Sequence, residues 1–201
     1  MAEKVIQKAV LESGANAKIL RIGQIVPSHK THSSKLWNVN EVLPLIIRSA
    51  GVMGVLPNRT SSGDGCRWLG VDVVANVMLD LCLPEQQANE AGHLLYNIVH
   101  PRTFSWKKIF LPKLKEAGME FNTVGYEDWI VLLRKNKEDV AKKLLGALGE
   151  MDDGIVDVQD GSGVLFDTTS AEALCPSFKD ARTSVEGDLV LQMIRAWREA
   201  W

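Results

Sequence analysis

Hydrophobic residues recur at helical spacing along seven stretches of the chain. In residues 187–200, for example, Val190, Met193, Ile194, Trp197 and Trp201 fall on or next to one stripe, which is the pattern of a helix with one buried face. The same spacing predicts helices over residues 3–13, 39–50, 73–83, 105–117, 127–134 and 138–148. We therefore expect a helix-rich protein.

A different pattern occupies residues 17–26, where apolar residues run almost without interruption. A short apolar run that follows a helix is typical of an interior strand of a parallel sheet, because both faces of such a strand are covered. Shorter strands are predicted at residues 66–70, at residues 93–99 and around Phe121. The order of these elements indicates a mixed α and β protein of the α+β class.

Composition and charge narrow the classes of function. The chain has 201 residues, of which 46% are hydrophobic, with 23 basic and 25 acidic side chains. This near-neutral balance gives no reason to expect nucleic acid or an anionic membrane surface as a partner. No apolar run approaches the roughly 20 residues needed to span a bilayer. Residues 1–4 have no secretory apolar region, so a cytoplasmic protein is expected.

Residues with catalytic or metal-binding chemistry form no recognised motif. Cys66, Cys82 and Cys175 are odd in number and widely spaced, which fits neither a disulfide framework nor a zinc site. His29 and His32 form an H-x-x-H pair without accompanying ligands, so a solvated loop is the favoured interpretation and no metal site is predicted. Considered alone, the residues define no active site.

Five blocks of sequence occur in a fixed order that composition does not explain. They are LRIGQI at residues 20–25, LWN at 36–38, PLIIRSA at 44–50, RWLGVDVVA at 67–75 and YNIVHPRTFSW at 96–106. This series resembles the thioester reductase domains of fungal nonribosomal-peptide-synthetase-like enzymes and carboxylic acid reductases, in the extended short-chain dehydrogenase/reductase superfamily. The resemblance runs from residue 1 to about residue 135.

The resemblance implies a division of the chain into two parts. Residues 1–27 would be a remnant of the Rossmann nucleotide-binding domain, with the strand at 17–26 a C-terminal strand of an otherwise missing Rossmann sheet. Residues 28–201 would form the helix-rich, substrate-binding C-terminal subdomain with short strands. The family's phosphate loop and its catalytic Ser/Thr, Tyr and Lys would lie upstream of Met1. We therefore expect NADPH in the complete enzyme, but no catalytic residue and no bound cofactor in this chain.

The resemblance also places part of a cofactor site. Gln24, Ile25, Val26 and Pro27 would lie at the carboxyl end of a Rossmann strand, where ligands of open α/β sheets bind, and would line the nicotinamide site. An ordinary role in the strand core explains Ile25 and Val26 equally well.

Five residues are candidates for substrate binding in the same family. Trp37 and Asn38 would open the subdomain near the acyl and phosphopantetheine path, although packing of Trp37 and helix capping by Asn38 explain them without function. Tyr96, Phe104 and Trp106 would wall the acyl pocket, although aromatic residues in such positions are more often part of the core.

Enzymes of this family reduce the thioester of a carrier-bound acyl chain with NADPH, to an aldehyde and sometimes to an alcohol. We interpret the chain as the substrate-binding part of such a reductase, inactive alone. Two alternatives stay open. One is a stand-alone binding or scaffold protein for a carrier protein or partner, without redox chemistry. The other is an independent enzyme whose site gathers distant residues such as Asp72, His93, His100 and Tyr126.

The partners that the resemblance implies are an acyl carrier (thiolation) domain with its phosphopantetheine arm and the missing Rossmann half. A strand with two apolar faces exposes apolar surface and unpaired backbone groups when its neighbours are absent. From the composition of residues 19–26 we therefore expect the strand to pair with its counterpart in a second chain, giving a homodimer.

Overall fold

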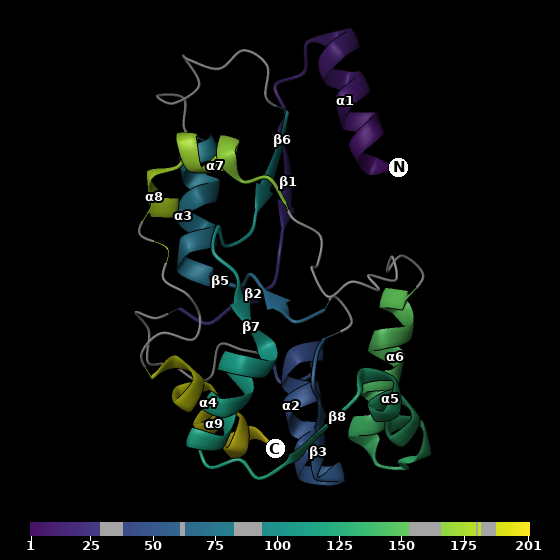
Figure 1. Ribbon diagram of the computed structural model, residues 1–201. Coiled ribbons are helices and arrows are strands. Elements are labelled where there is room, and N and C mark those ends of the chain that lie inside the picture. The colour runs from purple at the N-terminus through teal and green to yellow at the C-terminus, as the bar shows by residue number, and fades with distance from the viewer. Residues whose placement is uncertain (29–37, 61–62, 83–93, 153–165, 180, 182–187) are drawn as a thin grey trace. The chain divides into compact units, whose positions relative to one another are not determined.

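The computed structural model in Figure 1 describes residues 1–28, 38–60, 63–82, 94–152, 166–179, 181 and 188–201. These residues form two compact units, each assembled from three separate segments. Unit 1 comprises Met1–Ser28, Arg67–Arg102 and Phe166–Ser184, and unit 2 comprises His29–Cys66, Thr103–Leu165 and Val185–Trp201. The sequence predicted a boundary after residue 27, which is one residue before the end of the first segment of unit 1. It did not predict that two later segments belong to the same unit.

Unit 1 is built on two pairs of parallel strands. Strand β1 (Ile19–Ile22) pairs with β6 (Leu95–Ile98), and β2 (Ile25–Val26) pairs with β5 (Leu69–Gly70). The single strand expected over residues 17–26 is thus divided at Gly23 and Gln24 into two strands with different partners. Parallel pairing, which the apolar run predicted, is confirmed.

Helices cover one face of these strands with a continuous apolar core. The helices are α3 (Val71–Cys82), α7 (Thr169–Leu174) and α8 (Pro176–Lys179). The core of unit 1 gathers residues from these helices and from the strands: Leu69, Val74, Val77, Leu81, Tyr96, Ile98, Ala171, Cys175, Phe178 and Ala181. The helix predicted over residues 73–83 begins two residues earlier, at Val71, and holds Asp72 in its first turn.

Helix α1 (Ala2–Ser13) contacts the rest of unit 1 only lightly. None of its residues is buried, and Val5 and Leu11 are 63% and 84% exposed. The guanidinium of Arg21 on β1 donates to both carboxylate oxygens of Glu3, at 2.7 and 2.6 Å. These hydrogen bonds lower the pKa of Glu3 and raise the pKa of Arg21. Because both groups are exposed, the pair orients α1 more than it stabilises the fold.

Unit 2 is mainly helical, with two small pairs of strands. Its helices are α2 (Val42–Met53), α4 (Leu111–Glu116), α5 (Tyr126–Lys135), α6 (Asp139–Asp152) and α9 (Leu189–Ala200). Strand β3 (Val55–Pro57) runs parallel to β8 (Asn122–Val124), and β4 (Gly65–Cys66) runs antiparallel to β7 (Phe104–Ser105). Helix α2 packs on α6, and α4 packs on α9. Together, the two units confirm the expected α+β class.

Two of the predicted helices begin differently in the structure. Helix α2 starts at Val42, because the side chain of Asn38 accepts a hydrogen bond from the amide of Asn40 and closes a turn instead of capping a helix. The helix expected over residues 105–117 is divided. A π-helical turn, η3 (Trp106–Phe110), leads directly into α4, and Pro112 lies in the first turn of α4.

The stripe predicted for the last helix is confirmed. Val190, Met193, Ile194 and Trp197 on α9 are each at most 3% exposed. Within the described ranges, no helix has the length and apolar character needed to cross a membrane.

Candidate functional site

A cofactor was expected near the carboxyl ends of the parallel strands in unit 1. In open parallel sheets, ligands bind just beyond the carboxyl ends of the strands. The predicted segment, Gln24–Pro27, includes β2 itself and the residue that follows it. The carboxyl ends of β5 and β6 lie in the same unit and lead into Val71 and Val99. Of the predicted cofactor residues, Ile25 and Val26 thus form β2, Gln24 precedes it and Pro27 follows it.

The individual side chains of this segment have mainly structural surroundings. Val26 is 2% exposed, and Ile25 packs against the core of unit 1. Gln24 is exposed, and its side-chain amide donates to the carbonyl of Ile25 at 2.8 Å. The carbonyl of Gln24 accepts from the amide of Leu69 at 3.1 Å. Ile25 and Val26 are thus part of the strand core, and a role for the segment beside nicotinamide stays a prediction.

Two glycines at this edge allow close packing of the chain on itself. A Cβ atom at Gly23 would lie 2.7 Å from Cγ1 of Val99, and one at Gly70 would lie 2.8 Å from Oδ1 of Asp72. Both spaces are filled by the protein's own atoms, unlike the glycine-lined cradle that holds a pyrophosphate. Gly23 and Gly70 thus form no phosphate cradle.

His100 follows β6 at the same edge and is 1% exposed. Its Nδ1 accepts a hydrogen bond from the amide of Arg102 at 3.0 Å, and its own amide donates to the carbonyl of Arg67 at 3.3 Å. The imidazole is therefore held by a backbone turn. Of the other residues suggested for an independent active site, Asp72 belongs to unit 1, Tyr126 belongs to unit 2, and His93 lies outside the described residues.

The residues expected to bind substrate are divided between the units. Trp37 lies outside the described residues, and Asn38 is exposed in the turn before α2. Tyr96 is 2% exposed in the core of unit 1, with the ammonium of Lys18 5.7 Å from its ring centroid. Phe104 and Trp106 lie in unit 2 and are 5% and 0% exposed. The substrate-binding role of all five residues stays a prediction.

Trp106 and its neighbours are organised by Asp64, a residue that no sequence motif pointed to. The Asp64 carboxylate accepts from the Ser105 hydroxyl at 2.6 Å and from the amide of Lys107 at 2.7 Å. The Ser105 hydroxyl in turn accepts from the amide of Lys108 at 2.8 Å. These bonds satisfy amides at the start of η3 that have no partner within the helix. Because Asp64 and Ser105 are 41 positions apart, no local pattern indicated their contact.

Cys66, next to this network, is not an available nucleophile. It is 3% exposed, and burial, with a smaller contribution from Asp64, raises the pKa of its thiol to about 12. Since the thiolate is the reactive form, Cys66 stays inert near neutral pH. Within the described ranges, no three His, Cys, Asp or Glu side chains gather closely enough to hold a metal ion. His29 and His32 lie outside those ranges.

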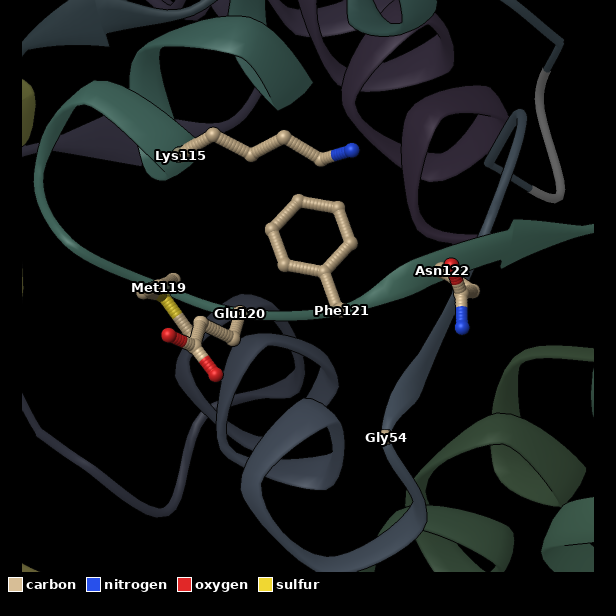
Figure 2. Close-up of a pocket in the computed structure, with 6 residues that line it drawn as sticks. All are labelled: Gly54, Lys115, Met119, Glu120, Phe121 and Asn122. Atoms are coloured by element: carbon tan, nitrogen blue, oxygen red, sulfur yellow. The ribbon is translucent and has the colours of Figure 1, made fainter.

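An open groove lies elsewhere in unit 2 and involves none of the predicted site residues. Figure 2 shows its lining, which consists of Gly54, Lys115, Met119, Glu120, Phe121 and Asn122. Its volume is about 500 Å³, which is within the usual range of small-molecule sites. Sequence reasoning missed the groove because its residues come from the end of α2, from α4 and from the approach to β8.

Comparison with known proteins relates the chain to reductases. No family model matches it. It is 28% identical over 139 residues to the adenylate-forming reductase Nps10 of Heterobasidion annosum, a match that covers 69% of the chain and 11% of that protein. The chain therefore corresponds to a small part of this relative.

Solved structures share the fold over almost the whole chain. The terminal R domain from the myxalamid PKS-NRPS biosynthetic pathway matches with a TM-score of 0.75 and 20% identity, covering 99% of this chain and 47% of that one. A thiolation-reductase di-domain from an archaeal non-ribosomal peptide synthetase matches with a TM-score of 0.66 and 14% identity. The match covers 99% of this chain and 39% of that one. RMD from Pseudomonas aeruginosa, complexed with NADPH, matches with a TM-score of 0.56 and 12% identity, covering 100% and 53%.

At these low sequence identities, the solved structures establish only the fold. The relative found by sequence, Nps10, is also a reductase. By sequence, the chain resembles a small part of an adenylate-forming reductase, and by fold it resembles part of the terminal reductase domains of nonribosomal-peptide-synthetase systems.

Proposed function

We propose that the chain is the substrate-binding C-terminal part of an NADPH-dependent thioester reductase, which releases a carrier-bound acyl chain as an aldehyde or an alcohol. The chain is inactive by itself, because the groups that bind the pyrophosphate and transfer the proton belong to the rest of the enzyme. The observation that carries the proposal is the match of 99% of the chain to only 47% of a terminal R domain. The proposed localisation is cytoplasmic.

The position of Gln24–Pro27 in unit 1 supports the proposal that this segment forms one wall of the cofactor site. Gln24–Pro27 span the short parallel strand β2, and Pro27 follows its carboxyl end, where nucleotide ligands of this architecture bind. Tight packing at Gly23 and Gly70 leaves no cradle for phosphate among the described residues. We therefore assign the nicotinamide wall to this chain and the pyrophosphate to the missing Rossmann half.

The pairing of strand β1 on one edge only supports the proposal that the missing Rossmann half is a partner. Among the described strands, β1 has one hydrogen-bonded neighbour, β6, and its last residue, Ile22, is 40% exposed. The backbone groups along the other edge of β1 are suited to a further strand. The proposed second partner is an acyl carrier domain with its phosphopantetheine arm, which is supported by the likeness to the thiolation-reductase di-domain.

A chimera tests the proposed function. The matching portion of the reductase domain of the Heterobasidion annosum relative is replaced by this chain, and NADPH oxidation and aldehyde formation are measured with an acyl-pantetheine thioester. We expect the chimera to form aldehyde, and we expect neither this chain alone nor the relative lacking that portion to do so. A chimera that folds and binds NADPH like the parent enzyme, but forms no aldehyde, would contradict the proposal. Turnover by the chain alone would contradict its inactivity.

In the absence of the Rossmann half, we propose that the open edge of β1 pairs with the same edge of a second chain. A two-fold axis would place the two β1 strands antiparallel and extend the sheet across the dimer. We expect light scattering to report a dimer in the micromolar range. We also expect Ile22→Lys to favour the monomer, because a lysine on an open edge opposes pairing.

A matched variant controls for the added charge. Ile109 on η3 is also 40% exposed and belongs to unit 2, so Ile109→Lys adds the same charge outside β1 and should leave the dimer intact. A clean monomer for the unmodified chain, or equal dissociation by both variants, would overturn this account of the dimer.

A further inference from the structure

The groove in unit 2 has an apolar floor beneath a cation. Met119 and Phe121 lie along its length and are each 8% exposed, so little of either side chain reaches solvent. Figure 2 shows the Lys115 side chain extended across the ring of Phe121, and its ammonium lies 5.2 Å from the ring centroid. This cation–π contact holds the charge at a defined place beside an apolar surface.

The charge of Lys115 is not neutralised by a described carboxylate. Its neighbour on α4, Lys113, forms an ion pair with Glu116 at 3.6 Å, whereas none of the described ion pairs includes Lys115. An ammonium held by an aromatic ring keeps its capacity to bind an anion, because the ring occupies only one side of it. The cation of this groove is thus available to a ligand.

Glu120 determines which anions the groove would accept. Its exposed carboxylate also lines the groove, and Figure 2 shows it on the opposite side of the backbone from the Phe121 ring. A negative charge at the rim opposes ligands with several negative charges, but it opposes a single carboxylate near Lys115 much less. The groove is therefore better suited to a monoanion with an apolar body than to a phosphate.

We propose that this groove binds small monocarboxylates with a flat or apolar body, with the carboxylate at Lys115 and the body against Met119 and Phe121. The site does not rest on the proposed reductase function, since none of its residues belongs to the sheet edge in unit 1. The opposed charges of Lys115 and Glu120 give the proposal two predictions of opposite sign.

The test is an NMR titration of the full chain with phenylacetate, and with neutral benzyl alcohol as the comparison. We expect phenylacetate to shift the amide signals of residues 115–122 saturably and to bind at least tenfold more tightly than benzyl alcohol. Lys115→Met should weaken phenylacetate binding by at least tenfold, because the ligand then buries a carboxylate without a counter-charge. Glu120→Gln should strengthen it two- to threefold.

Lys142→Met on α6 is the matched control, since it removes one exposed lysine of the same unit away from the groove, and it should leave the affinity within twofold. Three results would each overturn the proposal. They are no saturable shift with phenylacetate, equal affinity for benzyl alcohol, and equal weakening by Lys115→Met and Lys142→Met. Weaker binding of phenylacetate after Glu120→Gln would overturn the role assigned to the Glu120 carboxylate, which is to oppose anions.

Discussion

Replacing Trp106 with alanine is expected to lower the free energy of unfolding of unit 2 by about 3–5 kcal/mol. The indole is 0% exposed, and its ring lies 4.9 Å from that of Phe110. Its Nε1 donates a hydrogen bond of 2.9 Å to the carbonyl of Pro57 on β3. Alanine would leave a cavity and remove the donor for a buried carbonyl, and both effects destabilise.

The measurement is hydrogen exchange of unit 2 amides together with urea unfolding, because a chain of two units need not unfold in one step. Trp106→Phe keeps most of the packing but loses the bond to Pro57, so about 1–3 kcal/mol is expected. Val131→Ala, at a position that is 48% exposed, should change the stability by less than about 0.5 kcal/mol. A cost below about 1 kcal/mol for Trp106→Ala would show that the indole is not a core residue.

Gly23→Ala is expected to destabilise unit 1 by about 1–3 kcal/mol, although it adds a single methyl group. The new Cβ would lie 2.7 Å from Cγ1 of Val99, which is closer than two carbon atoms can approach. Val99 is 5% exposed and β-branched, so its side chain has little freedom to turn away. The backbone must shift, and the bond of 3.0 Å from the Gly23 amide to the carbonyl of Ile98 would weaken.

Two further variants separate the clash from a general effect of replacing glycine. Gly51 on α2 has no positive φ and no atom within 4 Å of the place that a methyl group would take, so Gly51→Ala should be neutral or stabilise by about 0.5–1 kcal/mol. Val99→Ala removes the clashing methyl group. The double variant Gly23→Ala/Val99→Ala should therefore cost less than the sum of the two single changes. Strict additivity in calorimetry or urea unfolding would refute the steric explanation.

Local periodicity predicted most helices correctly because most of them bury one face, with α1 as the exception. The stripe on α9 is an example, since the spacing of Val190, Met193 and Trp197 contains the information about which side is buried. The short helices α7 and α8 were not predicted. Helices of six and four residues have too few turns to show a period, and most of their stability comes from packing against α3 and β6.

The pairing of strands that are distant in sequence could not be predicted from local periodicity. The apolar run at residues 17–26 indicated a parallel sheet, but nothing in it separates the partner of Leu20 from the partner of Ile25. Similarly, the rule that ligands lie at carboxyl strand ends placed Gln24–Pro27 at a plausible edge. The groove at Lys115 depends on contacts among three elements, so no sequence window contains it.

The alternation of segments between the two units has a consequence for how the protein is made. Unit 1 needs residues up to Phe166–Ser184, and unit 2 needs Val185–Trp201, so neither can be completed while the first two-thirds of the chain emerge from the ribosome. Domains formed from one continuous segment fold during synthesis, from the N-terminus onward. Here β1 must wait for β6 and for the helices that cover the sheet, with its apolar residues exposed meanwhile. Chaperones that bind nascent chains are therefore expected to contribute strongly to the yield of this protein.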